Sequence, residues 1–172
     1  MRAALAFLIG FFVAAPIGHG APTVLDANQK QSVRLWLFGH PEYREAADGD
    51  CDCAQDILNM RQEARPEWPI RHGYHPYLLL GDFRHDGKTD FAIVVVNRKQ
   101  AKPTEGKLLI FDGPFSGAAK PPAFVGRIGL LRNAGLVLAV TGGVPIYGPL
   151  FSEGCMYLPM KGTYRQDCPT GE

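Results

Sequence analysis

The sequence of 172 residues has almost no net charge and few charged residues. Lys and Arg total 18, Asp and Glu total 17, and charged residues make up 20% of the chain. A formal charge of +1 provides no basic surface of the kind that attracts nucleic acids or anionic membranes. Both classes of partner are therefore excluded. The hydrophobic fraction of 46% also excludes wholesale disorder, which requires low hydrophobicity and high net charge.

The chain also lacks the motifs of several common enzyme classes. Ser116 lies in a Gly-rich segment, but the Gly-x-Ser-x-Gly sequence of serine hydrolases is missing. No Gly-rich phosphate-binding motif precedes a predicted helix. After residue 15, no apolar run approaches the length of a membrane span. We therefore expect no catalytic residue and no organic cofactor.

The N-terminal segment has the layout of a secretory signal peptide. Arg2 precedes 13 consecutive apolar residues, 3–15, and small residues before Ala21 suit cleavage. As a helix this run would span about 20 Å, too little for a hydrocarbon core of about 30 Å. Because the first cysteine is Cys51, we expect no lipoprotein anchor. We expect cleavage of residues 1–20 and export of a single soluble domain, 21–172, to the periplasm or the medium, with no membrane insertion of the mature chain.

Two of the four cysteines flank a segment that suits a β-hairpin. Cys155 and Cys168 lie on either side of Lys161-Gly162, which suits a two-residue turn. If Met160 pairs with Thr163, the same register places the two cysteines opposite each other. They then form a non-hydrogen-bonded pair, where side chains approach most closely. The pattern therefore favours a Cys155–Cys168 disulfide.

This pairing leaves Cys51 and Cys53, which are separated by one residue. They would form a strained, easily reduced bridge or stay reduced. The alternative joins Cys51 and Cys53 separately to the two hairpin cysteines, as disulfides of an exported chain. A structural zinc site is disfavoured, because the paired cysteine spacing of such sites is missing.

The mature chain divides into helical segments followed by strands. Helices are predicted over 26–38, with Asp26 as the cap, and over 54–64. Short apolar runs rich in β-branched and aromatic residues predict strands at 77–80, 91–96, 107–111, 124–128 and 135–141, before the hairpin. The segment 112–122 is rich in Gly and Pro and is expected to be exposed. We expect an α+β fold in which two N-terminal helices pack on an antiparallel β-meander of about five to seven strands.

The segment Gly81–Ala92 carries the pattern of a calcium loop. Asp82, Asp86 and Asp90 occupy its second, sixth and tenth residues, and Gly87 follows the second Asp. Carboxylates at such spacing, with a Gly for the sharp turn, match an oxygen-coordinated Ca²⁺ site. The flanks predict strands rather than helices, so the segment is not an EF-hand.

This segment resembles the FG-GAP/VCBS type of repeat, whose hallmark is Gly-Asp-Phe-Asn-Gly-Asp-Gly-x-x-Asp before a hydrophobic strand. The resemblance covers one copy, 77–96, and implies a Ca²⁺-binding loop of an extracellular protein. A single copy excludes the propeller that such repeats build. Arg84 and His85 stand where the family has Asn or Asp and then Gly.

An Arg cannot ligate a cation, so Arg84 creates two alternatives to bound Ca²⁺. Its guanidinium could pair with Asp82 or Asp86 and occupy the place of the metal. Otherwise the Asp side chains bind backbone N–H groups of the loop itself.

Two functional classes remain. The first is a non-catalytic binding or inhibitor-type module that presents 41–52, 84–88 and 112–122 to an unknown protein or envelope ligand. Trp68 and His85 are its candidate contact residues. The second is a metal-assisted hydrolase or Ca²⁺-binding protein that uses the loop 82–90.

Histidines near this loop could add ligands or an acid-base pair to the second class. They are His72, His75 and His85. However, His72 and His75 point to opposite faces of an extended segment. We therefore favour the binding module.

Overall fold

The computed structural model describes six ranges of the chain: 24–50, 54–62, 74–129, 134–139, 142–149 and 154–169. The predicted leader, residues 1–20, lies outside these ranges. Cys51, Cys53, Trp68 and His72 also lie outside them. What the sequence predicts for these residues stays a prediction.

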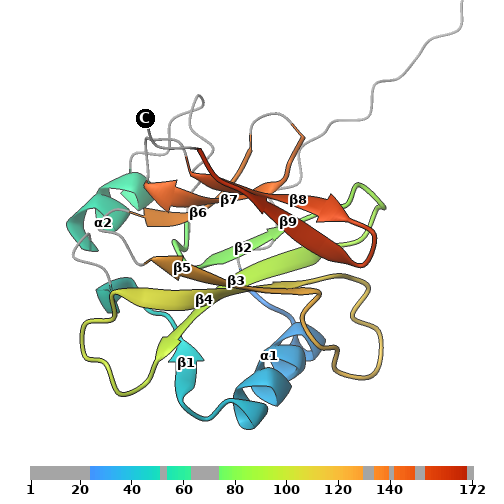
Figure 1. Ribbon diagram of the computed structural model, residues 1–172, viewed down its shortest axis with the longest axis horizontal. Helices are drawn as coiled ribbons and strands as arrows, with labels where there is room; N and C mark the ends of the chain where they lie inside the picture. Colours follow the sequence, from blue (N-terminus) through green and yellow to red (C-terminus); the bar gives the residue numbers. More distant parts are fainter. Residues whose placement is uncertain are drawn as a thin grey trace, which may run out of the picture.

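The described elements form three layers, a helix and two antiparallel sheets (Figure 1). The helix is α1, Ala27–Gly39. Sheet A contains β1 (Tyr43–Glu45), β2 (Leu78–Gly81), β3 (Asp90–Asn97), β4 (Glu105–Phe111) and β5 (Phe124–Gly129). Sheet B contains β6 (Ala134–Leu138), β7 (Pro145–Pro149), β8 (Cys155–Met160) and β9 (Thr163–Asp167). Sheet A lies in the middle, with α1 on one face and sheet B on the other (Figure 1).

The α+β class is confirmed, but the predicted arrangement of two helices on one meander is wrong. In the described ranges nine strands form two sheets, and α1 is the helix that packs on sheet A. A turn of 3₁₀ helix, η1 (Asp48–Asp50), and the short helix α2 (Ala54–Gln62) follow β1. Ile57 of α2 is buried at 1% exposure, but neither it nor any residue of η1 belongs to the two core clusters on the faces of sheet A. No helix in the described ranges has the length and hydropathy needed to span a membrane.

The two strands missing from the prediction are β1 and β7. β1 has three residues, too few for a recognisable pattern. β7 contains two prolines and Gly148, residue types that are depleted in strands. The sequence suggests a turn at Gly148, yet this residue lies in β7 opposite Gly135. A Cβ on the nearby Gly154 would come within 2.9 Å of the Gly148 Cα atom, so this part of sheet B requires glycine.

Local sequence explains where α1 begins and which face it buries. The Asp26 carboxylate accepts the Gln29 N–H, and the Gln29 side chain accepts the Asp26 N–H, which completes a capping box. Val33 and Trp36 lie on one side of the helix and are buried against sheet A, as the helical spacing predicts.

β3 is the central strand of the molecule. It pairs with β4 along one edge, and with β2 and β1 in succession along the other. Its even-numbered residues from Ala92 to Val96 join the core between the sheets, whereas Phe91, Ile93 and Val95 join the core under α1. This burial on both faces explains why the sequence of β3 is a continuous apolar run rather than an alternating one.

The C-terminal hairpin has the predicted register. Met160 pairs with Thr163, and Cys155 forms a disulfide with Cys168. Gly162, in the turn, has a φ of 77°, which glycine adopts without steric cost. The alternative that joins these cysteines to Cys51 and Cys53 is therefore wrong.

A half-buried ion pair holds β1 against the turn that follows it. Both nitrogens at the end of the Arg44 side chain donate to the Asp50 carboxylate at 2.6 Å, and the Ala47 N–H donates to the same carboxylate. The Asp50 side chain is 6% exposed. The Arg44 guanidinium holds the pKa of Asp50 below its usual range.

We expect Asp50→Asn to lower the free energy of unfolding at pH 7 by about 1–3 kcal/mol, because a charged pair is lost. The folded pKa of Asp50 lies below the unfolded value, so its contribution is complete above the usual Asp range and disappears as the pH falls through the lowered pKa. Urea unfolding of the wild type and Asp50→Asn at neutral and strongly acidic pH measures this contribution to the free energy of unfolding. The exposed neighbour Glu45→Gln is the control, and an equal loss for Asp50→Asn at both pH values would contradict the account.

Candidate functional site

The turn between β2 and β3 is anchored by one apolar side chain. Phe83 is fully buried between the two sheets, and full burial of a Phe contributes about 1.5–3 kcal/mol. The turn then reverses at His85 and Gly87, which have φ values of 55° and 78°. Gly87 thus provides the sharp turn expected of it. A Cβ on Gly81 would lie 2.9 Å from the Phe83 ring, so glycine is also required where the turn begins.

The carboxylates at the tip of the turn bind backbone within the turn. Asp82 accepts the N–H groups of Asp86 and Gly87, one on each oxygen, at 3.0 and 2.9 Å. Asp86 accepts the Lys88 N–H at 3.1 Å and the Lys88 ammonium at 3.0 Å. The contact with Lys88 lowers the pKa of Asp86. The prediction that these Asp side chains bind the loop's own N–H groups is confirmed.

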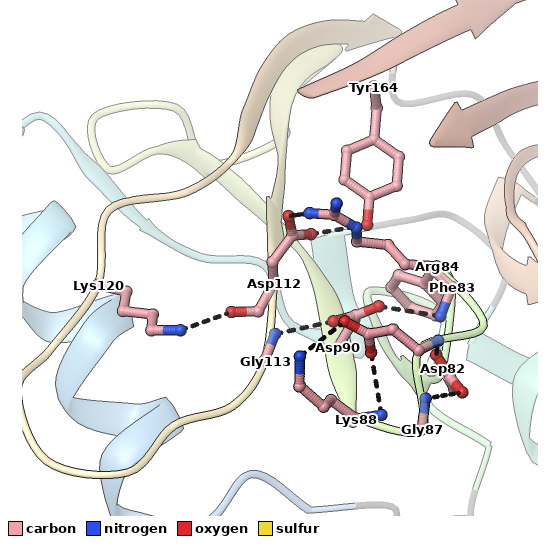
Figure 2. Close-up of polar contacts among 11 residues, drawn as sticks. Asp82, Phe83, Arg84, Gly87, Lys88, Asp90, Asp112, Gly113, Lys120 and Tyr164 are labelled. Carbon is pink, nitrogen blue, oxygen red and sulfur yellow. Dashed lines mark hydrogen bonds and ion pairs between the residues drawn. The ribbon is translucent and has the colours of Figure 1, made fainter. Parts of the chain in front are cut away.

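Asp90, the first residue of β3, is the buried member of the three. It is 1% exposed, and its two oxygens accept the N–H of Phe83 at 3.0 Å and the N–H of Gly113 at 2.8 Å (Figure 2). Burial raises the pKa of Asp90, and the N–H donors oppose that rise. Asp90 therefore joins the β2–β3 turn to the segment that follows β4.

Arg84 pairs with a residue outside its own turn. Its guanidinium donates to Asp112 at 2.5 Å, so the predicted pairing with Asp82 or Asp86 is wrong. The oxygens of Asp82 already bind N–H groups of the turn, and Arg84 follows the inward-pointing Phe83, so its side chain extends toward the end of β4 (Figure 2).

Asp112 links the two sheets. Its second carboxylate oxygen accepts the Tyr164 hydroxyl of β9 at 2.8 Å, and its carbonyl accepts the Lys120 ammonium at 3.5 Å (Figure 2). Burial and the bond to Asp112 raise the pKa of Tyr164, so its hydroxyl stays protonated and donates. One carboxylate therefore connects the β2–β3 turn, the end of β4 and sheet B.

The histidines that the structure describes do not converge. His85 Nε2 donates to the Gly142 carbonyl at 2.6 Å, in the turn between β6 and β7. His75 lies beside Arg61 of α2, with 3.5 Å between its Nδ1 atom and the guanidinium. Within the described ranges, no three His, Cys, Asp or Glu side chains are placed to hold a metal ion together.

Two of the three predicted contact loops come together, and the third does not. Arg84–Lys88 and Asp112–Pro122 lie side by side through Arg84–Asp112. The latter segment is partly packed rather than exposed, since Phe115 contacts Phe91 and the Lys120 N–H donates to Ser32 Oγ of α1. The described part of the third loop, 41–50, lies near the far end of β3, whose length is about 23 Å.

A polar hollow of about 300 Å³ lies at that far end, beside β1. The side chains that line it are Tyr43, Asn97, Gln100, Glu105, Lys107 and Arg127. These residues form no sequence motif, and among them Tyr43 lies in the predicted loop 41–52. Lys107 is the residue of this set that the sequence could have indicated, because it is the one charged side chain in the otherwise apolar stretch that ends β4.

The sequence predicts no individual role for Asp112, which is the first residue of the predicted loop 112–122, and none for Tyr164. Asp112 directly follows the predicted strand 107–111, and Phe111 pairs with Phe91. An antiparallel register of these two strands would have placed Asp112 beside the Asp-rich turn. For Tyr164 the sequence has no such signal, because its contact crosses between sheets.

We expect Asp90→Asn to lower the free energy of unfolding by about 1–3 kcal/mol. The amide keeps one acceptor oxygen but presents an NH₂ group to the other backbone N–H, which remains buried without an acceptor. The matched control is Asp86→Asn at the exposed tip, with an expected change within about 0.5 kcal/mol. Equal effects of the two substitutions in urea unfolding would contradict a special role for Asp90.

We expect Tyr164→Phe to lower the free energy of unfolding by about 1.5–3 kcal/mol, because it removes a hydrogen bond to a charged carboxylate. Tyr157→Phe is the matched control. The Tyr157 hydroxyl is buried with no hydrogen-bond partner in the described part of the chain, so its removal should leave stability unchanged or raise it. Thermal or chemical unfolding ranks the two variants, and the reverse order would refute this link between the sheets.

Comparison with known proteins assigns the chain to no family and no known fold. No family model matches the chain, and neither the curated proteins nor the solved structures give a match. The FG-GAP/VCBS resemblance of Gly81–Ala92 stays a prediction.

Proposed function

We propose that the protein is an exported, non-catalytic binding or inhibitor-type module whose Asp-rich turn has a structural role. One observation carries this proposal: five backbone N–H groups occupy the carboxylates of Asp82, Asp86 and Asp90. Side chains engaged in this way fix the turn and its neighbours. They are not poised to bind a substrate or a metal.

The contacts around the turn also count against a Ca²⁺ site or a metal-assisted hydrolase. A cation would have to share the oxygens of Asp82 and Asp90 with N–H donors that already occupy them, and Asp90 is buried. It would also approach the Lys88 ammonium, which lies 3.0 Å from Asp86. We infer that the turn keeps the shape of an FG-GAP/VCBS-like loop while N–H groups and basic side chains replace the metal.

Two features support export. The leader-like segment 1–20 has the three-part layout of a signal peptide. The Cys155–Cys168 disulfide suits an oxidising compartment, since such bonds persist outside the cytosol. In this proposal the mature chain acts in the periplasm or outside the cell, on a protein or an envelope ligand.

We expect millimolar Ca²⁺ to leave the thermal unfolding temperature unchanged. A ligand of the native state raises stability by about 2.7 kcal/mol when its concentration is a hundred times Kd, which is readily measured. Differential scanning calorimetry with CaCl₂, compared with NaCl at equal ionic strength, makes the test. Arg84→Asn restores the family residue and should also show no response, because backbone donors occupy the carboxylates.

A rise in unfolding temperature with Ca²⁺ in the wild type, abolished by Asp82→Asn, would establish a metal site and overturn the proposal. A rise that appears only in Arg84→Asn would show that the Arg84 side chain, rather than the N–H donors, prevents metal binding.

A further inference from the structure

We infer that the hollow beside β1 binds a small organic anion through Lys107 and Arg127. This inference deepens the proposed binding function and rests on it. The ligand class is a compact molecule that carries one carboxylate or phosphate group and several hydroxyls. Four features of the hollow support this ligand class: its position, its lysine, its exposed ion pair and its remaining polar groups.

The hollow lies on the α1 side of sheet A, where β1, β3, β4 and β5 run side by side. Lys107 pairs with Val95 on one side and with Arg127 on the other, so both basic residues point to the face that carries the α1 core. Trp36 of α1 contacts the Tyr43 ring with 5.6 Å between ring centroids. The wall of the hollow is therefore fixed by the packed core rather than by a free loop.

Lys107 is the residue that most directly indicates an anionic ligand. Its side chain is half-buried, and its ammonium lies 4.7 Å from the centroid of the Tyr43 ring. No carboxylate of the described residues forms an ion pair with it. An ammonium that is partly removed from water without a counter-ion is costly, so an anion in the hollow would gain a pre-positioned partner.

Arg127 provides a second cation that an anion can recruit. It donates to Glu105 at 2.7 Å, but the two side chains are 81% and 57% exposed. Ion pairs this exposed contribute little to stability, so Arg127 can exchange its partner at small cost. A planar guanidinium beside an ammonium suits a carboxylate or a phosphate, since both can take two hydrogen bonds at once.

The other lining groups favour a ligand rich in acceptors and hydroxyls. Asn97 Oδ1 already accepts the Lys99 N–H, which leaves the amide NH₂ to donate. Gln100 and Glu105 can accept from hydroxyl groups. Arg98, on the adjoining turn, donates to the carbonyl of Tyr43 at 3.4 Å and so adds a positive charge beside this lining residue. The volume of about 300 Å³ lies at the small end of ligand sites, which limits the occupant to a small molecule.

Glucuronate and glucose 6-phosphate are suitable probes, because they carry the two anionic groups on the same sugar, and glucose is the neutral control. In ¹H–¹⁵N correlation spectra of the mature chain, we expect millimolar anions to shift the amides of Asn97, Lys107 and Arg127. Glucose should not shift them. The probe that binds more tightly shows whether the hollow prefers a carboxylate or a phosphate. Binding of either anion should weaken as the salt concentration is raised.

Lys107→Gln should weaken binding by roughly tenfold or more, the value expected for a hydrogen bond to a charged group. Lys107→Arg keeps the charge and should retain binding. Arg127→Gln, on an exposed side chain, should weaken binding without affecting the fold. The matched controls are Lys161→Gln and Arg165→Gln on the β8–β9 hairpin, which should bind like the wild type.

Each outcome is informative. Glucose binding as tightly as the anions, or Lys107→Gln with unchanged affinity, would overturn the anion assignment. Absence of any shift with either anion would overturn it as well. Phosphate release from glucose 6-phosphate would instead contradict the non-catalytic function and leave the anion site in place, so failure of the inference and failure of the proposed function can be told apart.

Discussion

Burial of β3 on both faces is the constraint on which the rest of the structure depends. α1 covers one face and sheet B covers the other, so every side chain from Asp90 to Val96 is buried. β1, β2 and β4 take their register from this strand. Polar chemistry is therefore confined to its two ends, where Asp90 begins the strand and Asn97 finishes it.

At the beginning of β3, a buried charge joins two segments that are distant in sequence. A buried carboxylate is costly unless hydrogen bonds compensate it, and Asp90 finds two N–H groups that would otherwise be buried without acceptors. Asp112 repeats this arrangement nearby with Arg84 and the Tyr164 hydroxyl. A pattern that resembles a metal loop in sequence can therefore serve as a joint between two sheets, because N–H groups and cations satisfy the same oxygens.

Local features of the fold could be predicted from sequence, and contacts between layers could not. The capping box at Asp26, the buried runs of β3 and β4, and the Cys155–Cys168 register each follow from a few neighbouring residues. The division into two sheets depends on β7, whose prolines and glycine conceal a strand. The partner of Arg84 depends on the register between β3 and β4, which no local pattern specifies.

The two ends of β3 differ in how their charges are compensated. At the beginning, each carboxylate that the turn presents meets N–H groups of the backbone, so the site is complete without a ligand. At the far end, Lys107 rests on an aromatic ring and Arg127 shares an exposed pair with Glu105. A cation–π contact contributes about 0.5–1 kcal/mol at exposed sites, which compensates an ammonium less fully than a carboxylate does. The less fully compensated end is therefore where a ligand would gain most, although its residues form no recognisable sequence motif.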